Sequence, residues 1–105
     1  MSHPNKRRGT DLERWVVREA RNHNLDAKRM WGSDGRSRGL KKEVDVLVCA
    51  DIDHIYELQC KKTKTLAKKY KPIEGIDGQV FAEDRGEKMI MIRLKYYFRL
   101  IANQA

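Results

Sequence analysis

Two β-strand patterns joined by a short turn constrain the fold of this chain more than any other feature. Valine, isoleucine, leucine and tyrosine recur in residues 44–48 and 56–61, as is typical of strands. Segment 50–54 between them is short enough to be a hairpin loop. The middle of the sequence therefore predicts a β-hairpin.

The register of this hairpin decides which side chains meet. If the turn is centred near Ile52, Asp45 lies opposite Gln59, and directly opposed residues have Cβ atoms about 5 Å apart. Lys61 lies on the same strand face as Gln59. A carboxylate, an amide oxygen and an ammonium group are thus predicted to converge, as in a divalent-metal site with a catalytic lysine. Taken alone, Lys61 is also compatible with the start of a solvated basic helix.

Positive charge indicates the class of partner. The chain has 23 lysine and arginine residues against 15 aspartate and glutamate residues, a net charge of +8, which suits a polyanion such as nucleic acid. Phosphate contacts orient a protein without reading bases, which favours recognition of DNA shape. The residues expected to contact nucleic acid are Lys6, Arg7, Arg8, Arg29, Arg36, Arg38, Lys41, Lys42, Lys62, Lys64, Lys68 and Lys69.

The remaining patterns predict an α+β domain. Thr10 followed by Glu13 has the spacing of a capping box, so a helix is expected from Thr10 to about Asn24. The order α-β-β-β-α-β-β-α predicts helices that cover one mixed sheet, with residues 1–9 as a basic flexible arm and 10–105 as a single domain. Besides the first helix and the hairpin, the expected elements are a strand at 27–31, a flexible loop at 32–39, a helix at 63–70, strands at 79–83 and 88–94, and a last helix at 95–103.

Cysteine usage and hydropathy favour a cytoplasmic protein. No apolar run is long enough to span a bilayer, and the first residues lack the apolar stretch of a signal peptide. Cys49 and Cys60 lie within strand patterns and lack zinc-ligand spacing. Both are expected to be reduced thiols in the core.

The order of the expected elements, with the residues at four positions along it, resembles the PD-(D/E)xK nuclease superfamily, and in particular the Holliday-junction resolvases of archaea and phages. The resemblance covers about residues 8–64. The family's helix opening is similar to segment 9–14, which ends in Glu13 and Arg14, and its arginine and serine before a loop are similar to Arg29 and Ser33. Its metal-binding aspartate resembles Asp45, and its Glu-Cys-Lys triplet resembles segment 59–61.

The resemblance implies a restriction-endonuclease-like core that hydrolyses phosphodiester bonds in DNA four-way junctions. Asp45, Gln59, the Cys60 carbonyl and Glu13 would hold Mg²⁺ or Mn²⁺, while Lys61 would orient or deprotonate the attacking water. Ser33 would also belong to the catalytic site, although a serine there is equally typical of a turn.

Paired cuts across a four-way junction imply a twofold homodimer. The expected interface is the apolar part of the C-terminal hairpin or the aromatic segment 96–98.

Two positions depart from the family pattern. Val44 replaces a proline, a tolerable backbone change. Gln59 replaces a carboxylate, so the site has one negative charge fewer for a metal, and Glu57 on the same strand face is a candidate to supply it. Three interpretations stay open: an active natural glutamine variant, an engineered inactive form, or a degenerate site in a basic DNA-binding module. A nuclease for other branched or duplex DNA also remains possible.

Overall fold

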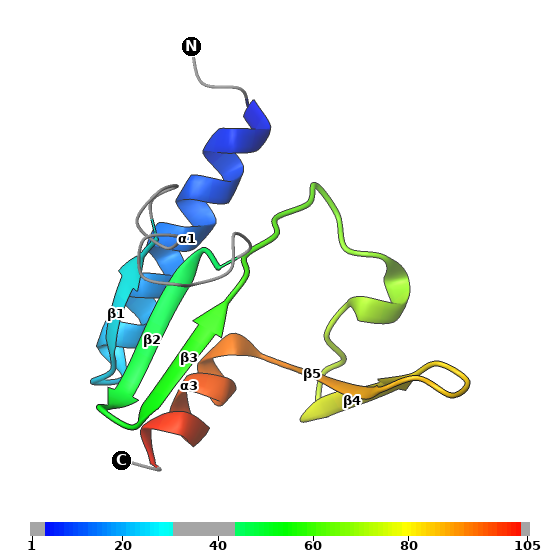
Figure 1. Ribbon diagram of the computed structural model, residues 1–105. Coiled ribbons are helices and arrows are strands. Elements are labelled where there is room, and N and C mark those ends of the chain that lie inside the picture. Colours follow the sequence, from blue (N-terminus) through cyan, green and yellow to red (C-terminus); the bar gives the residue numbers. More distant parts are fainter. Residues whose placement is uncertain (1–3, 31–43, 104–105) are drawn as a thin grey trace.

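A computed structural model, which describes residues 4–30 and 44–103, has an α+β fold (Figure 1). Its elements are α1 (Pro4–Asn22), β1 (Asp26–Arg29), β2 (Val46–Asp51), β3 (His54–Leu58), the short 3₁₀ helix η1 (Lys68–Tyr70), β4 (Gly78–Ala82), β5 (Lys88–Ile92) and α3 (Leu94–Ala102). None of the described helices has the length and apolar character needed to cross a membrane.

The first three strands form an antiparallel sheet in the order β1-β2-β3. Val46 pairs with Leu58 and Val48 with Tyr56, which is the predicted register, since one further step sets Asp45 against Gln59. At the other end of the hairpin, the register shifts between Cys49 and Asp51. The predicted central hairpin is therefore confirmed.

Helices α1 and α3 share one hydrophobic core with this sheet. Val46 and Val48, which are two residues apart and so lie on the same face of β2, are completely buried, as are Ala20 of α1 and Phe98 of α3. Each large side chain in such a core stabilises the fold by about 1.5–3 kcal/mol. One sheet face and two helices thus form a single packed unit.

Helix α1 begins at Pro4, so the prediction of a helix start at Thr10 is wrong. Thr10 lies inside the helix and cannot cap it, because a capping residue has non-helical backbone angles. Proline suits a first turn because its fixed φ is already helical and the amide hydrogen it lacks would have no partner there. The helix ends as expected near Asn24, which has a φ of 64°, the left-handed conformation that commonly follows a helix.

The predicted helix over 63–70 is also wrong, because only the single turn η1 forms there. Six lysines and no acid occupy residues 61–71, and lysines four residues apart, such as Lys64 and Lys68, repel one another on a helix surface. Pro72 then prevents continuation of a helix through this point.

The prediction of a single mixed sheet is also wrong. Strands β4 and β5 form a separate two-stranded antiparallel sheet, which stands apart from the first sheet (Figure 1). Parallel strands in one sheet require a long crossover connection, usually helical, whereas segment 59–77 is mostly irregular. The last helix and the turn that joins β4 to β5 occur where the sequence predicted them.

Replacement of Phe98 by alanine should lower the free energy of unfolding by about 3–5 kcal/mol, because it empties the centre of the core. Leu100→Ala in the same helix, where the side chain is 45% exposed, should cost much less. Chemical denaturation followed by far-ultraviolet circular dichroism measures both. Equal losses would contradict the described packing of α3.

Candidate functional site

Three strand ends meet around Asp45, just before β2. The backbone N–H of Met30, after β1, donates to the Asp45 carbonyl at 2.9 Å. The Asp45 N–H in turn donates to the Leu58 carbonyl, at the end of β3, also at 2.9 Å. Asp45 is therefore held between both neighbouring strands, and its side chain projects from a fixed backbone.

The carboxylate of Asp45 makes a further contact with the chain beyond β3. Its Oδ2 accepts a hydrogen bond from the backbone N–H of Cys60 at 2.8 Å. This bond joins the two chain segments just past the last regular strand pair, Val46–Leu58. Hydrogen bonds to an ionised acceptor are stronger than neutral ones, so the carboxylate fixes how β2 and β3 separate at this edge.

The Cys60 thiol lies near two carboxylates. Burial is the main cause that raises the pKa of this thiol to about 11, and the negative charges of Asp45 and then Glu13 raise it further. The thiol therefore stays protonated at neutral pH and is not a nucleophile. The negative charge of Glu13, on α1, therefore acts on the Cys60 thiol as well.

Glu13 is oriented by an arginine from β1. The Nε of Arg29 donates to the Glu13 Oε1 at 3.1 Å, and the two side chains are only 15% and 16% exposed. An ion pair so shielded from water is worth more than a surface pair. Arg29, predicted to contact nucleic acid, thus points toward Glu13 instead of open solvent.

The two other predicted catalytic side chains lie on the surface. Gln59 and Lys61 are both exposed, and no hydrogen bond or ion pair joins either of them to another residue in the described ranges. Strand alternation explains this, since Cys60 packs against the core and its neighbours therefore face away. Glu57 is exposed as well.

Two contacts join predicted site residues, Arg29 with Glu13 and Asp45 with Cys60. Gln59 and Lys61, which were predicted to converge with Asp45, are exposed and make no such contact among the described residues. Ser33, Arg36, Arg38, Lys41 and Lys42 lie outside the described residues, and the side chains of Lys6, Arg7 and Arg8 are not described. The predicted phosphate-binding residues after β3 are exposed, namely Lys62, Lys64, Lys68 and Lys69.

The donor set near Asp45 is compatible with magnesium but is not a complete metal cage. Within the described part of the chain, no three histidine, cysteine or acidic residues group closely enough to hold a metal ion. The hydrogen bonds described above use one oxygen of Asp45 and one oxygen of Glu13. Magnesium is commonly held by one or two carboxylates, several waters and substrate phosphate, so this ion does not require a full cage of protein ligands.

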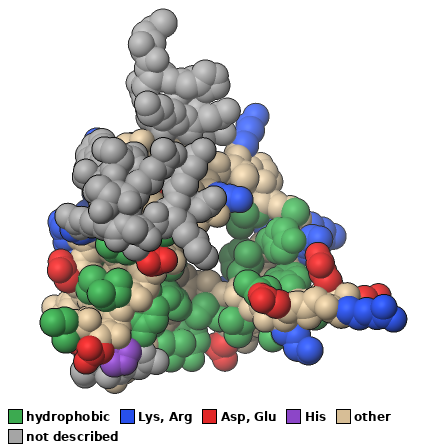
Figure 2. Space-filling view, viewed as in Figure 1, with side chains coloured by type: hydrophobic (Ala, Val, Ile, Leu, Met, Phe, Trp, Pro, Cys, Tyr) green, Lys and Arg blue, Asp and Glu red, His purple; other side chains and the backbone are tan. Residues whose placement is uncertain are grey.

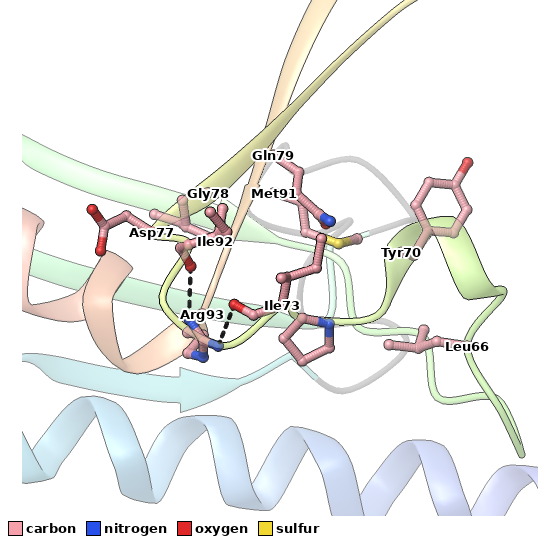
Figure 3. Close-up of a pocket in the computed structure, with 11 residues that line it drawn as sticks. Leu66, Tyr70, Ile73, Asp77, Gly78, Gln79, Met91, Ile92 and Arg93 are labelled. Carbon is pink, nitrogen blue, oxygen red and sulfur yellow. Dashed lines mark hydrogen bonds between the residues drawn. The ribbon is translucent and has the colours of Figure 1, made fainter.

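Two contacts in this cluster were not predicted from the sequence. The Arg29–Glu13 pair joins residues 16 positions apart, and no local pattern connects them. The Cys60 N–H bond to Asp45 does have a signal, because the expected register already set Asp45 beside segment 59–61. An apolar pocket at the C-terminal hairpin was not predicted from the sequence either (Figure 3).

Comparison of the chain with protein-family models, with curated proteins and with solved structures finds no match.

The pKa of Cys60 predicts how its alkylation depends on pH. With Cys49 replaced by serine, the rate of reaction with iodoacetamide should rise toward a midpoint near pH 11, because only the thiolate reacts. Asp45→Asn should move the midpoint to lower pH, since it removes a negative charge that disfavours the thiolate. Asparagine keeps an oxygen that can accept the Cys60 N–H bond.

Glu57→Gln is the matched control, because it removes an exposed carboxylate from the neighbouring strand without touching the cluster. It should leave the midpoint unchanged. Equal midpoints in the parent and Asp45→Asn proteins would contradict the placement of Asp45 beside Cys60.

Proposed function

We propose that this protein is a metal-dependent, structure-selective DNA endonuclease, with the four-way junction as its preferred substrate. The observation that carries the proposal is the hydrogen bond between Asp45, at the start of β2, and Cys60, past the end of β3, with the charge of Glu13 from α1 acting on the same thiol. These are three of the positions that resemble the nuclease motif. Polar residues of the motif thus lie at one sheet edge, next to a lysine-rich segment.

The carboxylates of Asp45 and Glu13, together with the Cys60 carbonyl and the Gln59 amide, would hold Mg²⁺ or Mn²⁺. A bound ion would supply Lewis-acid activation of water and neutralise charge on the phosphate. Arg29 holds Glu13 in one orientation, so this side chain loses little further conformational freedom when DNA binds. Preorganisation of this kind lowers the cost of assembling a site.

Lys61 is the candidate for orienting water and contacting the phosphate. Its exposure lets the ammonium group reach a backbone phosphate that approaches the sheet edge. The lysines that follow in segment 62–71 extend positive charge away from the site, and no acidic residue interrupts them. Such a stretch supports binding to DNA backbones without reading bases.

A second function is favoured by one specific observation. Gln59 and Lys61 face solvent, and Glu13 is already paired with Arg29, as expected if the constellation binds DNA without cutting it. In this alternative, the chain is a basic DNA-binding module with a degenerate site. Both functions predict salt-sensitive DNA binding, so only cleavage separates them.

Cleavage of a labelled synthetic four-way junction, beside linear duplex of the same sequence, tests the proposal. In Mg²⁺ we expect paired nicks confined to the junction, and in EDTA none. Asp45→Asn should slow cutting by at least about 100-fold, equivalent to about 2.7 kcal/mol of transition-state stabilisation, while leaving junction binding intact. Asp53→Asn, in the exposed turn at the opposite end of the hairpin, is the control and should cut normally.

Gln59→Glu tests the altered motif position directly. It adds the missing negative charge, so cutting should become faster or should persist at lower Mg²⁺ concentration. If the parent protein binds the junction tightly without cutting it and Gln59→Glu cuts, Gln59 is the cause of the lost activity. Binding without cutting in both proteins would favour the DNA-binding module, and no preference for the junction would refute the resolvase assignment.

A further inference from the structure

The C-terminal hairpin exposes an unusually large amount of apolar surface. Seven large apolar side chains in residues 66–91 are between 38% and 70% exposed. We call them the hairpin patch: Leu66, Ile73, Ile76, Val80, Met89, Ile90 and Met91. Figure 2 shows hydrophobic side chains gathered over this part of the molecule. Exposed apolar patches of this extent mark interaction sites in soluble proteins.

One face of the hairpin carries the most exposed side chains. Val80 pairs with Ile90 across the two strands, and these side chains are 70% and 64% exposed. Gly78, which pairs with Ile92, lies two residues from Val80 and so shares that face. A Cβ at Gly78 would lie 2.8 Å from the Ile92 side chain, so glycine permits this close approach. The face is thus apolar and open near its base.

The other side of the hairpin is only partly covered. The rings of Tyr70 and Phe81 meet edge to face at 5.2 Å, and Arg93 donates to the carbonyls of Ile73 and Ile76 (Figure 3). These contacts attach the preceding irregular segment to the hairpin. They also leave an open pocket of about 280 Å³, lined mainly by apolar side chains.

An isolated two-stranded sheet is marginally stable in water, and an uncharged strand edge invites pairing with another chain. Strand β5 reads Lys-Met-Ile-Met-Ile and has a charge at its first position only. The Cα radius of gyration of 15.1 Å exceeds the roughly 13 Å of a compact domain of about this length, as expected when the hairpin stands away from the core. The hairpin therefore lacks the packing that would normally cover it.

Charge along the hairpin indicates which partner fits. The tip, residues 83–88, contains three acidic and two basic residues, whereas Arg93 and Lys95 follow the base of β5. A nucleic acid would be repelled by the acidic tip and would gain little from a face of valine and isoleucine. If the hairpins of two copies pack antiparallel, the acidic tip of each lies against Arg93 and Lys95 of the other. Complementary charges then flank an apolar centre, as in many protein interfaces.

We propose that the hairpin patch is the interface between two copies of this chain, related by a twofold axis that pairs the Val80–Ile90 faces. A twofold interface uses the same surface on both copies. This face is apolar from the Gly78–Ile92 pair to the Val80–Ile90 pair, and Lys88 at the tip is its charged end. The interface supplies the partner that paired cutting under the proposed function requires, but its test does not depend on cleavage.

Sedimentation equilibrium of the full chain at several concentrations tests this proposal. We expect a species with twice the 12.3 kDa mass of one chain. Ile90→Lys should weaken association at least about tenfold, because it places a charge at the centre of the interface. Ile55→Lys is the matched control, since Ile55 is 55% exposed on β3, outside the hairpin patch, and it should leave the dimer intact.

A charge exchange provides a second test, because Ile90→Lys could also weaken association by unfolding the hairpin. Glu87→Lys should weaken the dimer, and Lys95→Glu added to it should restore association, because the exchanged pairs match again across the twofold axis. A monomeric parent protein, or an Ile90→Lys protein as dimeric as the parent, would overturn the proposal. No recovery in the doubly exchanged protein would overturn the antiparallel arrangement. A patch-dependent dimer that fails to cut any junction would refute the nuclease function alone.

Discussion

The hydrogen bond from the Cys60 N–H to the Asp45 carboxylate is the contact on which the candidate site depends. It joins the start of β2 to the chain beyond β3 at the point where regular strand pairing stops. Because Asp45 is also fixed through its own N–H and carbonyl, the carboxylate is part of the sheet edge and not a free surface group. The neighbouring Glu13, held by Arg29, then completes a cluster drawn from a helix and three strand ends.

The molecule divides into two parts with different physical character. Helices α1 and α3 and the sheet β1-β2-β3 enclose one core, with Val46, Val48 and Phe98 fully removed from water. The hairpin β4–β5 has little core of its own and keeps Val80 and Ile90 largely exposed. The candidate site lies at the edge of the well-packed part, so its geometry rests on the core. The hairpin instead offers a surface for association.

Local sequence patterns predicted those features that depend on neighbouring residues. The central hairpin and the register of its regular part, in which Val46 pairs with Leu58, follow from the short turn and the apolar strand patterns. The start of α1 was predicted wrongly because the spacing of Thr10 and Glu13 is that of a capping box, whereas the helix begins at Pro4 and Thr10 lies inside it. The expected helix at 63–70 does not form, because lysines four residues apart repel one another there and Pro72 prevents its continuation.

Features that depend on distant residues were not predictable in this way. The Arg29–Glu13 pair and the separation of the two sheets both arise from tertiary packing, which the periodicity of one segment does not encode. The exposure of Gln59 and Lys61 follows from the inward position of Cys60, because neighbouring residues along a strand face opposite sides.

The most direct test of the site is a titration of the ¹⁵N-labelled protein with Mn²⁺, which broadens amide signals near the bound ion in NMR spectra. If Asp45 and Glu13 hold a divalent ion, the amides of Met30, Asp45 and Cys60 should broaden first, and Mg²⁺ should restore them by competition. First broadening at the Asp51–His54 turn, where an exposed aspartate and histidine also lie close together, would contradict the account, as would no selective broadening at all.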